Sequence, residues 1–340
     1  MKRLRAYSIL LLSLLVFSTT LQAKNTLFQI LGGQRAGTSV FTFLKIGVGA
    51  RALGMANSGV TLSDDATVLY WNPAGAAQVG CCNLSVSHTK WLVDIDYSYL
   101  GYIQRVSKNI YLGLSAGALY TDPMEITTEY QPYGSGEYFN YGDLFLGLTY
   151  SQKMTDRFSY GFTIKYVQET LADLNMTDML MDLGTFYWTG FKSLRFCVSL
   201  VNFGPQARPD GSYMKPLREG GEKESKYTLF SPPTEFRIGS AIDLFEDSKA
   251  KTLLSAQLNH PVDNAENFVF GVEENLMDLL YLRGGVIFGQ TERSYAFGAG
   301  IRIPLGSYMF NVDYGWSDFG ILGDVQKIQM SIDFNVKNAQ

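Results

Sequence analysis

Histidine, the side chain that most often serves as a catalytic base, is scarce in this chain. Its 340 residues include only two histidines, His88 and His260. An esterase-like mechanism needs a nucleophile with a histidine in reach, and neither histidine stands in a recognisable local motif of that kind. The sequence therefore predicts no catalytic residues, and we expect that the protein is not an enzyme.

Acidic and thiol groups give no metal site either. Asp64 and Asp65 resemble a metal-binding pair, but no further acidic residues follow at calcium-loop spacing. The three cysteines, two of them adjacent at Cys81 and Cys82, match neither a zinc spacing nor a disulfide framework. We expect Ser63, Asp64 and Asp65 to form the N-cap and acidic first turn of a helix instead. No metal and no cofactor are predicted.

The composition excludes several classes of protein. The chain has 28 Lys and Arg against 32 Asp and Glu, so it lacks the basic character of a nucleic-acid-binding protein. Apolar residues make up 46%, enough to bury a core, which argues against disorder. No apolar run approaches the roughly 20 residues of a membrane-spanning helix.

Apolar and polar residues alternate through most of the chain. In residues 328–336, every second side chain is apolar and those between are polar. The same alternation occurs over 236–244, 158–166 and 308–316, and in the last two the apolar face begins and ends with aromatic rings. Such faces are typical of transmembrane strands whose ends lie in the two interfacial girdles. A soluble sandwich is the alternative, but it would bury the charges of the opposite faces at a high cost.

Counting these segments predicts a barrel. The segments give an all-β transmembrane fold, an antiparallel outer-membrane β-barrel of about fourteen strands. Its two long connections, 121–142 and 204–233, both follow odd-numbered strands and would lie outside the cell, whereas the connections on the other side are short. The predicted strands are 83–90, 95–105, 110–120, 143–152, 157–168, 178–188, 193–203, 234–245, 250–259, 267–274, 279–289, 294–304, 307–316 and 325–336.

The first eighty residues have a different pattern. Residues 1–23 combine a basic start, an apolar stretch and a small residue at the expected cleavage site, which predicts a secretory signal peptide. In residues 24–80, apolar positions recur at helical spacing from Leu44 to Met55, and Asn72 is placed to cap a short helix that begins at Pro73. We expect this segment to plug the lumen of a barrel formed by residues 81–340, with a periplasmic tail as the alternative.

The two long connections are the regions in which function would be found. The first carries aromatic side chains among glycine and serine, a mixture typical of contact surfaces, and it forms either a docking surface or a lid over the barrel mouth. The second, 204–233, is rich in proline and mixed charge, and is either a solvated loop or one that a partner orders. The candidate contact residues of the first loop are Tyr130, Tyr133, Tyr138, Phe139 and Tyr141.

The N-terminal segment also carries motifs that resemble those of a known family. The run Gly37 to Met55, the acidic Asp64-Asp65-Ala66 and the element Trp71-Asn72-Pro73-Ala74-Gly75 resemble the N-terminal signature of the PorV/PorQ family. That family belongs to the FadL-like superfamily of outer-membrane barrels, in which an Asn-Pro-Ala element marks the plug. Weaker similarities continue toward the C-terminus.

The resemblance implies a fold and two alternative functions. It implies a fourteen-stranded barrel in the outer membrane, in contact with its lipid, with an N-terminal plug. It further implies a part in type IX protein secretion or surface attachment, with secreted cargo or other secretion components as partners bound through the outer loops. A FadL-like channel for hydrophobic small molecules is the alternative, and the aromatic loop suits both.

Overall fold

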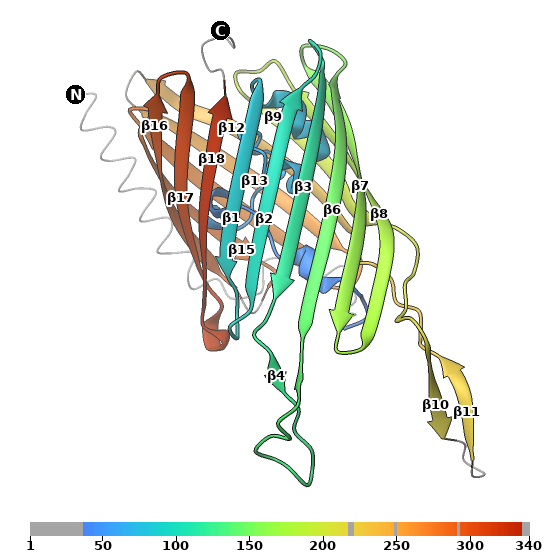
Figure 1. Ribbon diagram of the computed structural model, residues 1–340. Helices are drawn as coiled ribbons and strands as arrows, with labels where there is room; N and C mark the ends of the chain where they lie inside the picture. Colours follow the sequence, from blue (N-terminus) through green and yellow to red (C-terminus); the bar gives the residue numbers. More distant parts are fainter. Residues whose placement is uncertain (1–36, 217–220, 248–249, 291–292, 335–340) are drawn as a thin grey trace.

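A computed structural model describes residues 37–216, 221–247, 250–290 and 293–334. The predicted signal peptide, residues 1–23, lies outside the described residues. Within them, fourteen antiparallel strands form one closed barrel, because the first strand pairs along its length with the last (Figure 1). The barrel strands are β1 (Cys82–Lys90), β2 (Asp96–Arg105), β3 (Ile110–Tyr120), β6 (Tyr141–Lys153), β7 (Phe158–Leu171), β8 (Leu174–Trp188), β9 (Arg195–Phe203), β12 (Glu235–Asp247), β13 (Ala250–Pro261), β14 (Asn267–Leu276), β15 (Leu280–Phe288), β16 (Tyr295–Leu305), β17 (Tyr308–Asp318) and β18 (Asp324–Phe334).

The predicted fold class is confirmed, and each of the fourteen predicted strands overlaps one barrel strand. The main difference concerns the connection expected over residues 169–177. Strand β7 instead continues to Leu171, and strand β8 begins already at Leu174. The two strands meet in a tight turn in which Ala172 has φ 51°. The alternation of apolar and polar residues fades in this region because these strand ends extend beyond the hydrocarbon layer of the membrane. Their outer faces need not be apolar there, although their backbones still pair.

The two faces of the barrel wall differ as a membrane barrel requires. In β18 the outward Ile328 and Met330 are 55% and 56% exposed, whereas the inward Lys327 and Gln329 are buried. Large apolar side chains are exposed in the same way on strands all around the barrel. An outer surface of this kind is stable in hydrocarbon and not in water.

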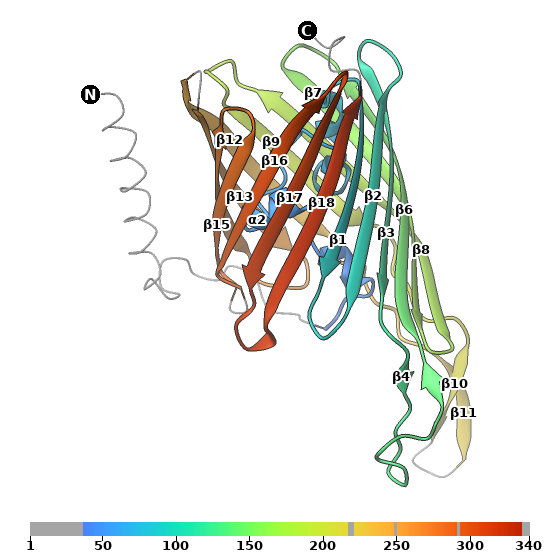
Figure 2. The same ribbon diagram turned by 60° about the vertical axis from the view of Figure 1, so that its left-hand side comes forward.

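The two ends of the barrel differ in the length of their connections. At one end, which we call the short-turn end, short connections such as 106–109 and 154–157 join the strands. At the other, the long-loop end, two hairpins project well beyond the wall, and both views show them on the same side of the molecule (Figures 1 and 2). These hairpins are β4 (Met124–Glu125) with β5 (Tyr138–Phe139), and β10 (Ser212–Pro216) with β11 (Glu222–Lys226).

The described part of the N-terminal segment, residues 37–80, lies inside the barrel. Its element α2 (Ala50–Gly54) contacts strands β15 to β18, whereas η2 (Pro73–Gln78) contacts β3, β6, β7 and β8 on the facing wall. Its other elements are η1 (Thr42–Lys45) and α3 (Val68–Trp71); a further short helix, η3 (Gly320–Leu322), lies between β17 and β18. None of the described helices has the length and apolar character needed to cross a membrane.

The helix expected from Leu44 to Met55 is not continuous. It is interrupted between η1 and α2, where Gly49 has φ 88°, a conformation that favours glycine. Wall side chains replace the missing helical hydrogen bonds there: Lys327 Nζ donates to the Gly47 carbonyl, and the Ala50 amide donates to Gln329 Oε1 at 2.8 Å. The helical spacing of apolar residues was therefore misleading, because barrel side chains satisfy this backbone.

Candidate functional site

A network of charges fixes the N-terminal segment to the barrel wall. Arg51 of α2 binds Glu273 of β14 in a bidentate manner, with Nε to Oε2 at 2.8 Å and Nη2 to Oε1 at 2.7 Å. Arg283 of β15 donates from Nε to the same carboxylate and from Nη1 to Asp313, both at 2.6 Å. The side chains of Arg283, Glu273 and Asp313 are 3%, 5% and 6% exposed, so this network is shielded from water. Bidentate pairs of this kind are directional and hold α2 in one position.

The predicted helix cap at Ser63, Asp64 and Asp65 is wrong. Helix α3 begins only at Val68, and its N-cap is Thr67, which makes no side-chain cap hydrogen bond. Asp64 instead forms an ion pair with Arg51, which holds the pKa of the Asp64 carboxyl well below its usual range. Asp65 accepts from the Thr67 amide at 2.9 Å and from Gln329 Nε2 at 2.7 Å. The acidic residues thus make tertiary contacts that the sequence alone did not indicate.

The Trp71-Asn72-Pro73-Ala74-Gly75 element lies against the opposite wall. Asn72 caps η2 as predicted, since its Oδ1 accepts from the Ala74 amide at 3.1 Å and Pro73 takes the first position. Its Nδ2 also donates to the Thr185 carbonyl of β8 at 3.0 Å, a contact to the wall. A Cβ at the inward Gly184 would lie 2.0 Å from Asn72 Oδ1, so a larger residue there would displace the Asn72 side chain from these contacts.

Apolar side chains fill the lumen near the long-loop end. Phe43 and Tyr99 both pack on Phe145 of β6, with ring centroids 6.4 and 6.3 Å apart. The Phe41 amide donates to Glu169 Oε2 at 2.7 Å and the Val40 amide to the Ser231 carbonyl at 3.2 Å, which ties the segment to strand β7 and to the second long loop. These residues belong to a buried cluster that extends from the N-terminal segment to the wall.

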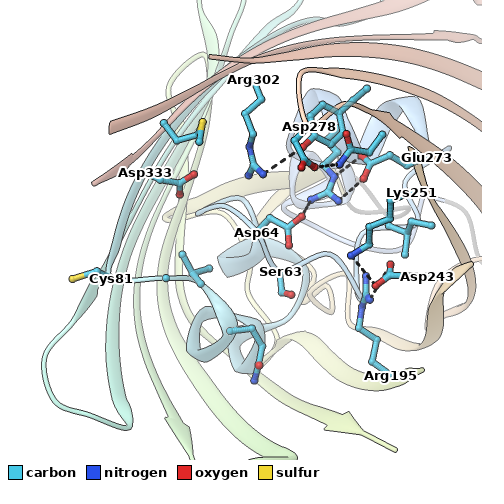
Figure 3. Close-up of a pocket in the computed structure, with 18 of the residues that line it drawn as sticks. Ser63, Asp64, Cys81, Arg195, Asp243, Lys251, Glu273, Asp278, Arg302 and Asp333 are labelled. Atoms are coloured by element: carbon cyan, nitrogen blue, oxygen red, sulfur yellow. Dashed lines mark hydrogen bonds and ion pairs between the residues drawn. The ribbon is translucent and has the colours of Figure 1, made fainter. Parts of the chain in front are cut away.

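A polar cavity of about 580 Å³ lies at the short-turn end (Figure 3). Lys251 Nζ lies 3.2 Å from Asp243 Oδ2 in its wall, and Arg195 Nη1 lies 3.7 Å from Asp243 Oδ1. Arg302 donates to Asn311 Oδ1 at 2.9 Å and to the Tyr281 hydroxyl at 3.3 Å. This lining suits water and polar groups rather than an apolar molecule. The charged residues of the lining are Arg51, Asp64, Arg195, Asp243, Lys251, Glu273, Asp278, Arg302 and Asp333.

The predicted aromatic contact residues separate into two groups. Tyr130, Tyr133 and Tyr138 are 94%, 98% and 61% exposed, on the projecting part of the first long loop. Phe139 belongs to β5 and is half-buried, and Tyr141 belongs to β6, where its hydroxyl donates to Asp143 at 2.8 Å. The structure therefore leaves three of the five side chains free for contact.

Sequence reasoning missed the charge network around Arg51. Glu273 and Arg283 lie on inward positions of two predicted strands, and an inward charge in an otherwise apolar strand was the available signal. Nothing in the order of residues indicates that Arg51 reaches Glu273 across 222 positions of sequence. In the described parts of the chain, no three His, Cys, Asp or Glu side chains are grouped so as to hold a metal ion.

Comparisons with known proteins match one family model over part of the chain and one fold over most of it. Residues 31–186 match the model of the type IX secretion system protein PorV. No curated protein sequence matches the chain. The resemblance to the PorV family found in the N-terminal motifs is confirmed over these residues.

Similar solved structures include hydrocarbon transporters. The CymD monoaromatic hydrocarbon channel matches with a TM-score of 0.55 at 12% identity, covering 84% of this chain and 96% of that one. The Ralstonia pickettii toluene transporter TbuX gives 0.55 at 11%, covering 84% and 97%, and a Pseudomonas aeruginosa FadL homologue gives 0.54 at 12%, covering 85% and 98%. At such identities the likeness establishes the FadL-like fold alone.

Proposed function

Because this chain is an outer-membrane barrel of FadL-like fold whose residues 31–186 match the PorV family, we propose that it serves type IX secretion by binding partner proteins at its long-loop end. Outer-membrane barrels have short periplasmic turns and long extracellular loops, so the long-loop end faces the cell exterior. The partners we propose are secreted cargo or other secretion components. We propose no catalytic role, since the family and fold are those of transport and secretion-associated barrels.

The observation that carries this proposal is the aromatic arm, which we define as residues 121–140. It projects beyond the barrel (Figure 1). Its Tyr130 and Tyr133 side chains are almost completely exposed. Tyrosine supplies a large, rigid and amphipathic contact area at low cost in side-chain entropy, among glycines and serines that adapt the backbone. An arm that extends away from the mouth is better suited to contact another protein than to cover the lumen as a lid.

The interior of the barrel supports the same proposal. Residues 38–48 and the inner wall fill the lumen near the long-loop end with apolar side chains, and the cavity at the short-turn end is lined with charges. Among the described residues, the first of these layers is packed and the second is polar, so neither offers an apolar path to a hydrophobic molecule. We therefore propose that the outer surface of the protein performs its function, while the N-terminal segment remains seated.

A channel for hydrophobic small molecules is the second candidate. The fold favours it, because the similar structures include a monoaromatic hydrocarbon channel and a toluene transporter. On this alternative the N-terminal segment would have to leave its wall contacts to open a path. Impaired uptake of an aromatic hydrocarbon after deletion of the gene, with normal surface delivery of secreted proteins, would support the channel and contradict our proposal.

A double substitution in the aromatic arm tests the proposal. We expect Tyr130→Ser with Tyr133→Ser to reduce the amount of secreted protein that reaches the cell surface, because contact area is lost without any change in the barrel. The matched control is Ile321→Ser, which removes a fully exposed apolar side chain from another loop of the same end. Equal delivery by both variants would count against a docking role for the arm.

A further inference from the structure

The hairpin formed by β10 and β11 has two chemically different faces. The register places Tyr213 opposite Ser225 and Lys215 opposite Lys223, and residues directly opposite each other share a face. The Tyr213 and Tyr227 rings pack together on that side, with centroids 5.2 Å apart and planes at 31°. We call the set Tyr213, Lys215, Lys223, Ser225 and Tyr227 the lysine–tyrosine face.

The acidic residues lie on the other face of the hairpin. Met214 is opposite Glu224, and the Ser212 hydroxyl donates to Glu224 Oε1 at 2.5 Å. Glu222 and Lys226 occupy the same side by their register. Although the hairpin contains both signs of charge, its lysine–tyrosine face carries only positive ones among the described residues.

This arrangement opposes the stability of the hairpin itself. Like charges directly opposite each other destabilise a pair of strands, and a two-stranded sheet is marginal even without that repulsion. Among the residues that the structure describes, no carboxylate lies within salt-bridge distance of Lys215 or Lys223, so no described side chain compensates their charges. A bound anion placed between the two ammonium groups would relieve their repulsion.

The position of the hairpin indicates which anion is near. In both views it extends past the long-loop end on the side of β7 and β8, outside the ring of strands rather than over the barrel mouth (Figures 1 and 2). The surface beside the barrel at that end is the outer leaflet of the outer membrane, whose glycolipid headgroups are phosphorylated sugars. The hairpin is thus held over a layer of opposite charge.

We propose that the lysine–tyrosine face binds the phosphorylated sugar headgroups of outer-leaflet glycolipids. Ammonium groups form charge-assisted hydrogen bonds to phosphate oxygens. Tyrosine rings favour the interfacial layer, where one side is apolar and the other wet, and they offer flat surfaces to sugar rings. This site is separate from the aromatic arm and does not depend on the partner proteins proposed above.

The test uses the full chain in nanodiscs of phosphatidylcholine, with delipidated, phosphorylated lipopolysaccharide core oligosaccharide as the probe and calorimetry as the readout. Lys223→Gln should weaken binding by about threefold to tenfold, the range expected for one charge-assisted contact at an exposed site. Lys226→Gln, three positions away in the same strand but on the other face, is the matched control and should change the affinity less than about twofold.

Dephosphorylated oligosaccharide provides the second arm of the experiment. It should bind weakly, and with it the two variants should not differ. Equal losses for Lys223→Gln and Lys226→Gln, or full binding of the dephosphorylated probe, would overturn the proposal. The proposal would also be overturned if the unaltered protein bound no oligosaccharide but bound an acidic protein through these lysines. That result would reassign this face to a protein partner.

Discussion

The carboxylate of Glu273 links the N-terminal segment to the barrel wall. It accepts from both Arg51 and Arg283, and its side chain is only 5% exposed. In Glu273→Gln the two guanidinium groups would remain buried without their shared negative charge. Removing one partner of a buried ion pair costs about 3–5 kcal/mol, and we expect the lower value because Arg51 keeps its contact with Asp64.

Hydrogen exchange can measure this loss directly. The Leu53 amide is bonded to the Gly49 carbonyl and the Met55 amide to that of Ala52, so their exchange reports local opening of α2. A loss of about 3 kcal/mol should accelerate exchange of a peptide covering residues 50–56 roughly a hundredfold, while barrel strands stay protected.

The neighbouring glutamate provides the control. Glu274 is on the opposite face of the same strand and accepts from the Thr252 hydroxyl at 2.6 Å, away from α2. Glu274→Gln should therefore leave exchange of residues 50–56 unchanged. If Glu273→Gln and Glu274→Gln had equal effects, or if neither accelerated exchange, the charge network would not be what seats the segment.

Three further predictions concern the same segment. Gly285→Ala should lower the yield of heat-resistant folded barrel on gels, because its Cβ would lie 2.4 Å from the Met55 carbonyl carbon, whereas Gly80→Ala, with open space around it, should not. Asn72→Ala should lower the melting temperature, because the cap of η2 contributes about 1 kcal/mol and the hydrogen bond to Thr185 is lost as well. An unchanged melting temperature would show that the cap does not stabilise the protein. The pKa of Asp64 is lower in the folded protein than the roughly 3.9 of an unfolded chain. The ion pair of Asp64 therefore stabilises the segment fully above the unfolded pKa, and this stabilisation is lost as the pH falls through the folded pKa. Asp64→Asn should thus accelerate exchange at pH 7 by less than about tenfold, because that side chain is 54% exposed and screened, and faster exchange than in Glu273→Gln would contradict this ranking.

The barrel could be predicted because each of its strands has one face in lipid and one in a packed lumen. That constraint imposes alternation of the kind seen in 328–336, and alternation fixes both the strand and its orientation. Where the constraint ends, as in the outer ends of β7 and β8, the sequence no longer showed the strand although the backbone continues to pair.

The interior segment could be predicted only in part. Asn72 and Pro73 were identified because a cap depends on neighbouring residues alone. The break before α2 and the roles of Asp64 and Asp65 were missed, because they depend on Lys327, Gln329 and Arg51, which the fold brings together from distant positions. Local patterns predict local structure, but not which wall residue replaces a helical hydrogen bond.

Locking the N-terminal segment to the wall tests most directly whether the protein acts from its outer surface. A Cβ at Gly113 would lie 2.4 Å from Cδ2 and 3.3 Å from Cγ of Leu69, so Leu69→Cys with Gly113→Cys brings two thiols into range of a disulfide between α3 and β3. The measurement is the amount of secreted protein on the surface of cells that carry only this variant, with the lock oxidised and then reduced. We predict equal delivery in both states, and a loss in the oxidised state that reduction restores would contradict the account.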